Sequence, residues 1–115
     1  MSKFDDAVTL YKEAMHGKLG IAKINDELLT AVTKGLGPSI YLADASLVSC
    51  SDKTEKDRVK NNFLIKKLGM TDAPALDSAI EEVCEKFGSS NRNKYRAVFY
   101  YLLTEKLGKQ DFFAK

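Results

Sequence analysis

The spacing of apolar residues in segment 72–88 is the feature that most constrains the fold of this chain. Apolar side chains recur there at intervals of three and four residues, at Leu76, Ala79, Ile80, Val83, Cys84 and Phe87. That interval places all six on one face of an α-helix. Asp72 is suited to cap the helix, Pro74 is tolerated in its first turn, and Gly88 can adopt the left-handed conformation that ends it. The sequence therefore predicts an amphipathic helix over residues 72–88.

The same pattern predicts four more helices. A serine, asparagine or aspartate that can serve as N-cap precedes each of them, and a glycine follows each. They cover residues 2–17, 25–35, 52–69 and 90–108. The buried face of the first helix is expected to comprise Phe4, Ala7, Val8, Tyr11, Ala14 and Met15.

Segment 35–51 permits two interpretations. Gly35, Gly37 and Pro38 interrupt any helix that reaches them. Pro38 suits the first position of a new helix, so one or two short helical turns can follow. The rival is a pair of short strands over residues 39–43 and 46–50, because periodicity does not separate the two structures in runs this short. The helices predicted on both sides favour the short helical turns.

These elements predict a single domain, residues 1–115, with an all-α fold in a compact orthogonal or bundle-like array of five to six short helices. The apolar share of 44% and charged share of 30% are typical of soluble domains. No apolar run approaches the roughly 18 residues of a membrane span, and the N-terminal residues lack a secretory pattern. The two cysteines, Cys50 and Cys84, have no metal-binding spacing. We expect reduced thiols in a cytoplasmic protein.

Four strings of the sequence together carry a resemblance. They are KGLGPSIY, ADASLVSCSD, NNFLIKKLG and GSSNRNKYRAVFYYLL. The chain resembles an uncharacterised family of small bacterial proteins that is catalogued as a domain of unknown function, and the similarity runs from SKFDDAV to the helix around Tyr101. The resemblance implies a bacterial cytosolic source and a compact stand-alone domain. It implies no activity, cofactor or binding site.

The sequence predicts neither a catalytic centre nor a metal or cofactor site. The only histidine, His16, falls in the last turn of the first predicted helix, where the helix dipole favours a partly charged imidazole. A thiolate at Cys50 would gain from the helix expected to start at Asp52, but that acidic residue opposes it. The loop 34–39 lacks the phosphate-binding GxxxxGK[ST] pattern. We interpret it as a break between helices.

Three cations lie at the start of the last predicted helix, next to polar residues that can cap it. Together they form the candidate anion- or nucleic-acid-binding site, which comprises Ser89, Ser90, Asn91, Arg92, Lys94 and Arg96. Helix N-termini attract anions, and cations in a first turn oppose the helix dipole, so a functional reason is worth seeking. The alternative is that these cations, with those of residues 53–60, pair with acidic residues of 72–88 such as Asp77, Glu81 and Glu85.

Six consecutive apolar residues, 98–103, cover every side of the last predicted helix. This pattern is typical of a helix buried at the centre of a bundle. If the helix is not central, Tyr100 and Tyr101 are the candidate interface residues, because aromatic residues are enriched at interfaces. The sequence does not decide whether Phe112 and Phe113 dock on the domain.

The expected function is that of a small cytosolic, non-enzymatic interaction module that recognises a protein partner or itself. One alternative is nucleic-acid binding through the basic segments, which comprise Lys53, Lys56, Arg58, Lys60, Arg92, Lys94 and Arg96. The net charge of +2 gives that alternative little support. A second alternative is a small enzyme or binding protein for a phosphorylated metabolite, which would use the loop 34–39 or the helix start at 89–92.

Overall fold

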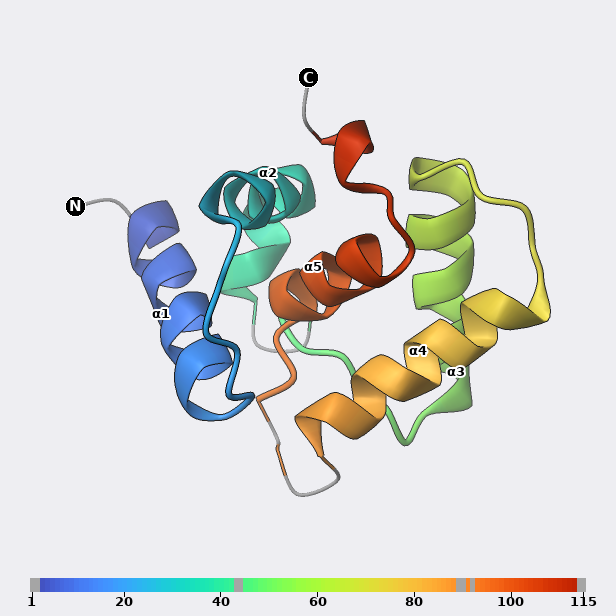
Figure 1. Cartoon of the computed structure of the whole chain (residues 1–115), viewed down its shortest axis with the longest axis horizontal. Coiled ribbons are helices and arrows are strands. Elements are labelled where there is room, and N and C mark those ends of the chain that lie inside the picture. Colours follow the sequence, from blue (N-terminus) through green and yellow to red (C-terminus); the bar gives the residue numbers. More distant parts are fainter. Residues whose placement is uncertain (1–2, 43–44, 89–90, 92, 114–115) are drawn as a thin grey trace.

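The structure, a computed structural model, describes residues 3–42, 45–88, 91 and 93–113, and its fold is all-α (Figure 1). The five α-helices are α1 (Lys3–Gly17), α2 (Asp26–Leu36), α3 (Lys53–Arg58), α4 (Pro74–Phe87) and α5 (Arg96–Lys106). A π-helix, η2 (Val59–Lys67), continues α3, and two 3-10 helices are η1 (Gly37–Tyr41) and η3 (Gln110–Phe112). Within these ranges the extended pairing is a single antiparallel bridge between Leu47 and Tyr95. The predicted fold class is confirmed.

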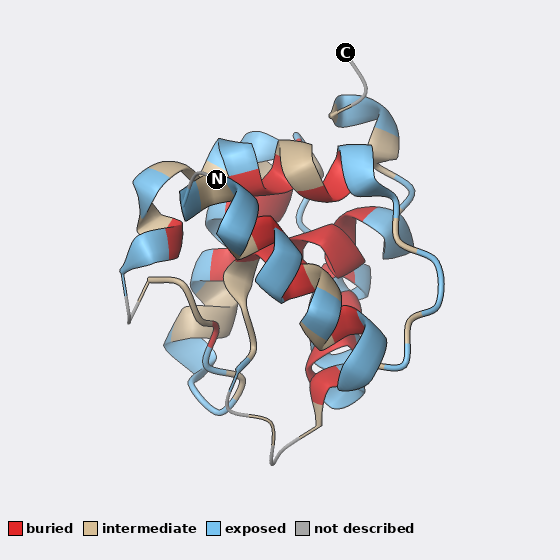
Figure 2. Cartoon of the chain, turned by 90° about the vertical axis from the view of Figure 1, so that its left-hand side faces the viewer, coloured by how far each residue is buried: buried red, intermediate tan, exposed pale blue. Residues whose placement is uncertain are grey.

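Helix α5 forms the centre of the array, where it packs against α1, α2 and α4 (Figure 1). Every residue from Ala97 to Thr104 is buried, so this stretch is enclosed on all sides. The continuous apolar run of the sequence is explained by this position. Figure 2 shows the buried residues gathered toward the inside of the molecule, with the exposed residues of the other helices around them.

Helix α4 buries the face that its sequence predicts, with all six expected apolar residues buried. It begins later than expected, because Ala73 rather than Asp72 occupies the N-cap position and supplies no side-chain hydrogen bond. The Asp72 carboxylate instead pairs with the Lys60 ammonium at 3.3 Å. Gly88 ends the helix with a φ of 88°, a conformation that favours glycine.

The segment predicted as one α-helix over residues 52–69 changes its winding. The Asp52 side chain accepts a hydrogen bond from the Thr54 amide at 2.9 Å, as an N-cap should. Beyond Arg58 the turns widen into η2, whose buried residues are Val59, Phe63 and Leu64. Phe63 and Leu64 follow Val59 by four and five residues, a spacing that suits the wider turns of a π-helix. The predicted helix is therefore present over this segment, and its second part is wound as a π-helix.

In the described part of the ambiguous segment 35–51, residues 37–41 form a short helix rather than a strand. Helix α2 continues through Gly35 to Leu36, and Gly37 caps it with a φ of 64°. Pro38 lies in the first turn of η1, as expected. The later part of the segment pairs with the chain before α5, since the Val48 amide donates to the Lys94 carbonyl at 2.8 Å.

The two cysteines form a disulfide, so the prediction of reduced thiols is wrong, as is the weaker interpretation of Cys50 as a reactive thiol. Cys50 and Cys84 are 34 residues apart in sequence, but their Cα atoms are 5.9 Å apart. Cys84 lies on the buried face of α4, and the chain that leads to α3 brings Cys50 over it. Sequence separation gave no indication of this contact.

Among the helices that the structure describes, none has both the length and the apolar character of a membrane span.

Candidate functional site

The helix expected to open the predicted anion site begins later than the sequence predicted. Helix α5 begins at Arg96, not near Ser90, so Asn91 and Lys94 lie in the preceding connection. The Lys94 ammonium turns back and donates to the Asn91 carbonyl at 2.5 Å. Ser89, Ser90 and Arg92 lie outside the described residues.

Arg96, the remaining candidate, is held inside the structure. Its Nε donates to the Ala45 carbonyl at 2.7 Å, and its Nη2 donates to the Leu47 carbonyl at 3.1 Å. The same Nη2 lies 2.6 Å from a carboxylate oxygen of Glu55. Nη1 donates to the Tyr100 hydroxyl at 3.1 Å. With its side chain 15% exposed and its charge paired, Arg96 is in no position to contact an anionic polymer.

The cations of residues 53–60 are paired with carboxylates. Lys56 Nζ lies 2.5 Å from Glu81, and Lys60 Nζ lies 3.3 Å from both Asp72 and Asp77. The hydrogen bonds to Asp77 and Asp72 raise the pKa of Lys60. Lys53 and Arg58 contact acids of their own helix. The acidic segment therefore pairs with Lys56 and Lys60 through Glu81 and Asp77. Arg96, for which the same acidic partners were predicted, pairs with Glu55 of α3 instead.

The two candidate interface tyrosines lie in the core, as expected for a central helix. Tyr100 is 7% exposed and stacks on Phe63 with ring centroids 4.0 Å apart. Tyr101 is 0% exposed. Its hydroxyl accepts a hydrogen bond from the Asn25 amide at 2.8 Å and donates to Glu105 at 3.1 Å. Neither ring can reach a partner unless the domain opens.

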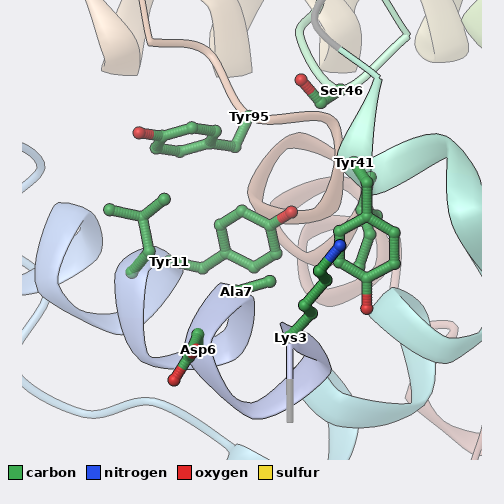
Figure 3. Close-up of a pocket in the computed structure, with 9 residues that line it drawn as sticks. Lys3, Asp6, Ala7, Tyr11, Tyr41, Ser46 and Tyr95 are labelled. Atoms are coloured by element: carbon green, nitrogen blue, oxygen red, sulfur yellow. The ribbon is translucent and has the colours of Figure 1, made fainter.

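A pocket that sequence analysis missed lies between α1, η1 and the segments joined by the Leu47–Tyr95 bridge (Figure 3). We call it the tyrosine pocket, because Tyr11, Tyr41 and Tyr95 line it. Its volume is about 370 Å³. Lys3 and Asp6, from the first turn of α1, supply its charged groups. Such a size is near the lower end for ligand sites, so the pocket suits a small group rather than a large cofactor.

Tyr11 is the buried member of the pocket. It is 2% exposed, and its ring packs against Tyr95 with centroids 5.1 Å apart. Burial, with smaller contributions from Tyr95 and Tyr41, raises the pKa of Tyr11 to about 12. The hydroxyl has no hydrogen-bond partner among the described residues, and Figure 3 shows it directed into the pocket. Its environment therefore leaves a neutral phenol available to a ligand.

A second pocket of about 480 Å³ continues along α1. Leu10 and Tyr95 line both pockets, so the two are adjacent. The second one is lined further along by Leu19, Phe87 and Asn91. Together they form a surface along α1 that we call the α1 groove.

Exposed apolar side chains gather at the rim of this groove. Leu10 is 45% exposed and Tyr41 is 48% exposed, and both line the tyrosine pocket. Leu42, at 60%, follows Tyr41 directly. Among the described residues, the remaining large apolar side chain with such exposure is Phe112 at 43%. The exposed apolar residues are thus concentrated at one place.

One signal for this site was present in the sequence. Leu10 lies off the predicted buried face of the first helix, so the sequence placed one apolar side chain on its outer side, although a single such residue is common on protein surfaces. Nothing comparable pointed to Tyr41, because its segment permitted two structures. Among the described residues, no group of histidine, cysteine or acidic side chains could hold a metal ion.

Comparison with known families agrees with the resemblance seen in the sequence. Residues 10–111 match the model of a family described as Protein of unknown function (DUF2853). No curated protein matches the chain. Because the match covers most of the chain, this protein belongs to the DUF2853 family.

Proposed function

We propose that this protein is a non-enzymatic interaction module that receives an apolar segment of a protein partner in the α1 groove. The observation that carries the proposal is that Leu10 and Tyr41, two of the four exposed large apolar side chains among the described residues, both line the tyrosine pocket. Exposed apolar side chains beside a pocket are typical of interaction sites. Helix α1 spans 15 residues, so the groove offers a length of roughly 20 Å along its axis.

Nucleic-acid binding receives less support from the same structure. A protein that binds nucleic acid needs cations free to replace the counterions of phosphates. Lys56, Lys60 and Arg96 instead contact carboxylates. The remaining basic surface carries little excess charge, since the whole chain has a net charge of +2.

An enzymatic role also receives little support. The His16 ring nitrogen Nδ1 lies 2.8 Å from the Ile21 carbonyl, which gives the imidazole a structural partner at the end of α1. In the 34–39 loop, the Ser39 hydroxyl donates to the Leu36 carbonyl at 2.8 Å and so supports the turn itself. Neither group lies in the tyrosine pocket.

The bacterial source and the cytoplasmic location expected from the sequence remain part of this proposal. The Cys50–Cys84 disulfide provides a test of the location, because such bonds persist in oxidising compartments and are rare in the cytosol. Alkylating the free thiols in intact cells and measuring the mass of the protein would show whether Cys50 and Cys84 are reduced or joined in the cell. Reduced thiols would agree with a cytoplasmic location, and an intact disulfide would contradict it.

The proposal is tested by affinity purification of the tagged protein from lysate of its source cells, with and without nuclease. We expect a protein partner that is retained by the wild type, lost with Leu10→Ser or Tyr41→Ser, and retained with Phe112→Ser. The last variant is a matched control, because Phe112 is about as exposed as Leu10 but lies on η3, away from the groove. Retention by all variants, or a partner that disappears with nuclease alone, contradicts the proposal. Sedimentation of the same variants identifies self-association.

A further inference from the structure

We propose that the tyrosine pocket binds the C-terminal residue of the partner's chain, and that Lys3 and the Tyr11 hydroxyl hold its carboxylate. This inference rests on the proposed function and assigns the chemistry that the partner must present. The pocket supplies an apolar wall for the last side chain and a donor pair for the carboxylate.

The Tyr11 hydroxyl is the first observation behind this assignment. A buried tyrosine normally has a hydrogen-bond partner for its hydroxyl. Tyr11 is 2% exposed, yet none of the side chains and backbone groups described around it bonds to that hydroxyl. No described side-chain atom is both fully buried and unpartnered, so the hydroxyl oxygen must still reach the open space of the pocket. A ligand atom at that point would complete its hydrogen bonding.

The charged and polar groups at the pocket favour a ligand group with a negative charge. In Figure 3 the Lys3 ammonium and the Tyr11 hydroxyl point toward the same part of the pocket, whereas the Asp6 carboxylate points away from it. An ammonium and a phenol both donate hydrogen bonds, and donors of this kind bind an anionic oxygen strongly. One lysine with an aspartate nearby suits a single negative charge better than a doubly charged phosphate. A carboxylate satisfies this condition.

The surroundings favour a chain end over a free acid. Ala7 and Ile40 join the tyrosine rings in lining the pocket, so a carboxylate that enters must bring an apolar body with it. Beyond Leu10 the groove continues into the second pocket, where Leu19 and Phe87 offer a further apolar surface. Asn91 and Asn93, which line that pocket, carry amide groups that can bond to a peptide backbone. A peptide that ends in the tyrosine pocket would use both pockets.

Calorimetric titration with synthetic peptides tests the inference without the natural partner. The probes are acetylated hexapeptides that end in leucine or phenylalanine, each with a free C-terminus and as the C-terminal amide, together with N-acetyl-phenylalanine. We expect the free acid to bind at least about tenfold more tightly than the amide, which corresponds to about 1.4 kcal/mol. Tyr11→Phe and Lys3→Gln should each remove most of that preference. Asp6→Asn should increase it.

The controls separate this preference from folding and from general charge effects. Tyr11→Phe keeps the ring, so its melting temperature should match that of the wild type. Lys23→Gln removes an exposed cation that lines neither pocket and should leave the preference unchanged.

Each of the other possible results of these titrations contradicts a different part of the inference. Equal affinities of acid and amide overturn the carboxylate assignment and leave the interaction module standing. Binding of N-acetyl-phenylalanine as tight as that of the hexapeptides overturns the chain-end assignment in favour of a small acid. A preference for the acid without any protein captured from lysate contradicts the proposed function but not the carboxylate chemistry. No binding by any probe at millimolar concentration overturns the inference.

Discussion

The Arg96 guanidinium and the Glu55 carboxylate form an ion pair of 2.6 Å at which both side chains are nearly excluded from water, with 15% and 13% exposed. The pair joins α5 to α3, and the same guanidinium binds the carbonyls of Ala45 and Leu47. A residue that appears in the sequence as part of a basic surface cluster is thus an internal connection between three segments.

Arg96→Met should lower the free energy of unfolding by about 3 kcal/mol, because it leaves the Glu55 carboxylate and two carbonyls without their donor. Arg58→Met is the control, since Arg58 contacts the same Glu55 at 3.6 Å but is largely exposed. Its loss should change the stability by less than about 0.5 kcal/mol. Urea unfolding followed by circular dichroism measures both. Equal effects of the two substitutions would mean that the Arg96 pair is no stronger than a surface contact.

The double variant Cys50→Ser, Cys84→Ser should have a free energy of unfolding about 2–4 kcal/mol lower than the wild type, because the disulfide restricts the unfolded chain across a sequence separation of 34 residues. Addition of a reductant should destabilise the wild type by a similar amount and leave the double variant unchanged. Titration of the purified, non-reduced protein with a thiol reagent should find no free thiol. Two free thiols in that assay would show that the disulfide does not form.

Tyr101→Phe should lower the stability of the protein and Tyr11→Phe should not, although both tyrosines are buried. Removal of the Tyr101 hydroxyl leaves the Asn25 amide without its acceptor and should cost about 1–2 kcal/mol. Removal of the Tyr11 hydroxyl breaks no hydrogen bond to a described residue and should be neutral within about 0.5 kcal/mol. The comparison uses urea unfolding at neutral pH. A large loss for Tyr11→Phe would mean that its hydroxyl has a structural partner after all.

The protein should lose stability between pH 10 and pH 12. Burial raises the pKa of Tyr11 and of Tyr101 to about 12, from an ordinary value of 10.0. Because the folded state holds these protons more tightly than the unfolded state, unfolding releases protons in this range. The contribution is therefore fully present below pH 10 and disappears as pH rises through about 12.

Urea unfolding at a series of alkaline pH values, with phenolate absorbance recorded in parallel, checks this expectation. The Tyr11→Phe variant should show a shallower decline than the wild type, since one of the two groups no longer titrates. A decline that begins well below pH 10, or one that the substitution leaves unchanged, would assign the alkaline sensitivity to other groups.

The sequence predicted the elements whose signals are local. The apolar face of α4 follows from its period, and the Asn25 cap of α2 is confirmed by its hydrogen bond to the Leu28 amide. The start of α5 could not be predicted in this way. The backbone at Lys94 and Arg96 bonds to the distant segment around Leu47, and this pairing prevents the helix from beginning earlier.

The same reason explains why the candidate site was missed. Tyr11 was expected on the buried face of the first helix, and it is indeed buried. What the sequence could not show is that Tyr41 and Tyr95, from two other segments, come beside it and leave its hydroxyl facing open space. A pocket that depends on three separate segments has no local sequence pattern.

The central position of α5 has a consequence for how the chain reaches this structure during synthesis. Helices α1 and α2 leave the ribosome well before α5, yet both pack against it. Their apolar faces therefore have no complete partner until residues 96–106 have emerged, and the earlier helices can only associate loosely. Folding should therefore follow translation of residues 96–106, and the apolar faces of α1 and α2 stay partly exposed on the nascent chain until then.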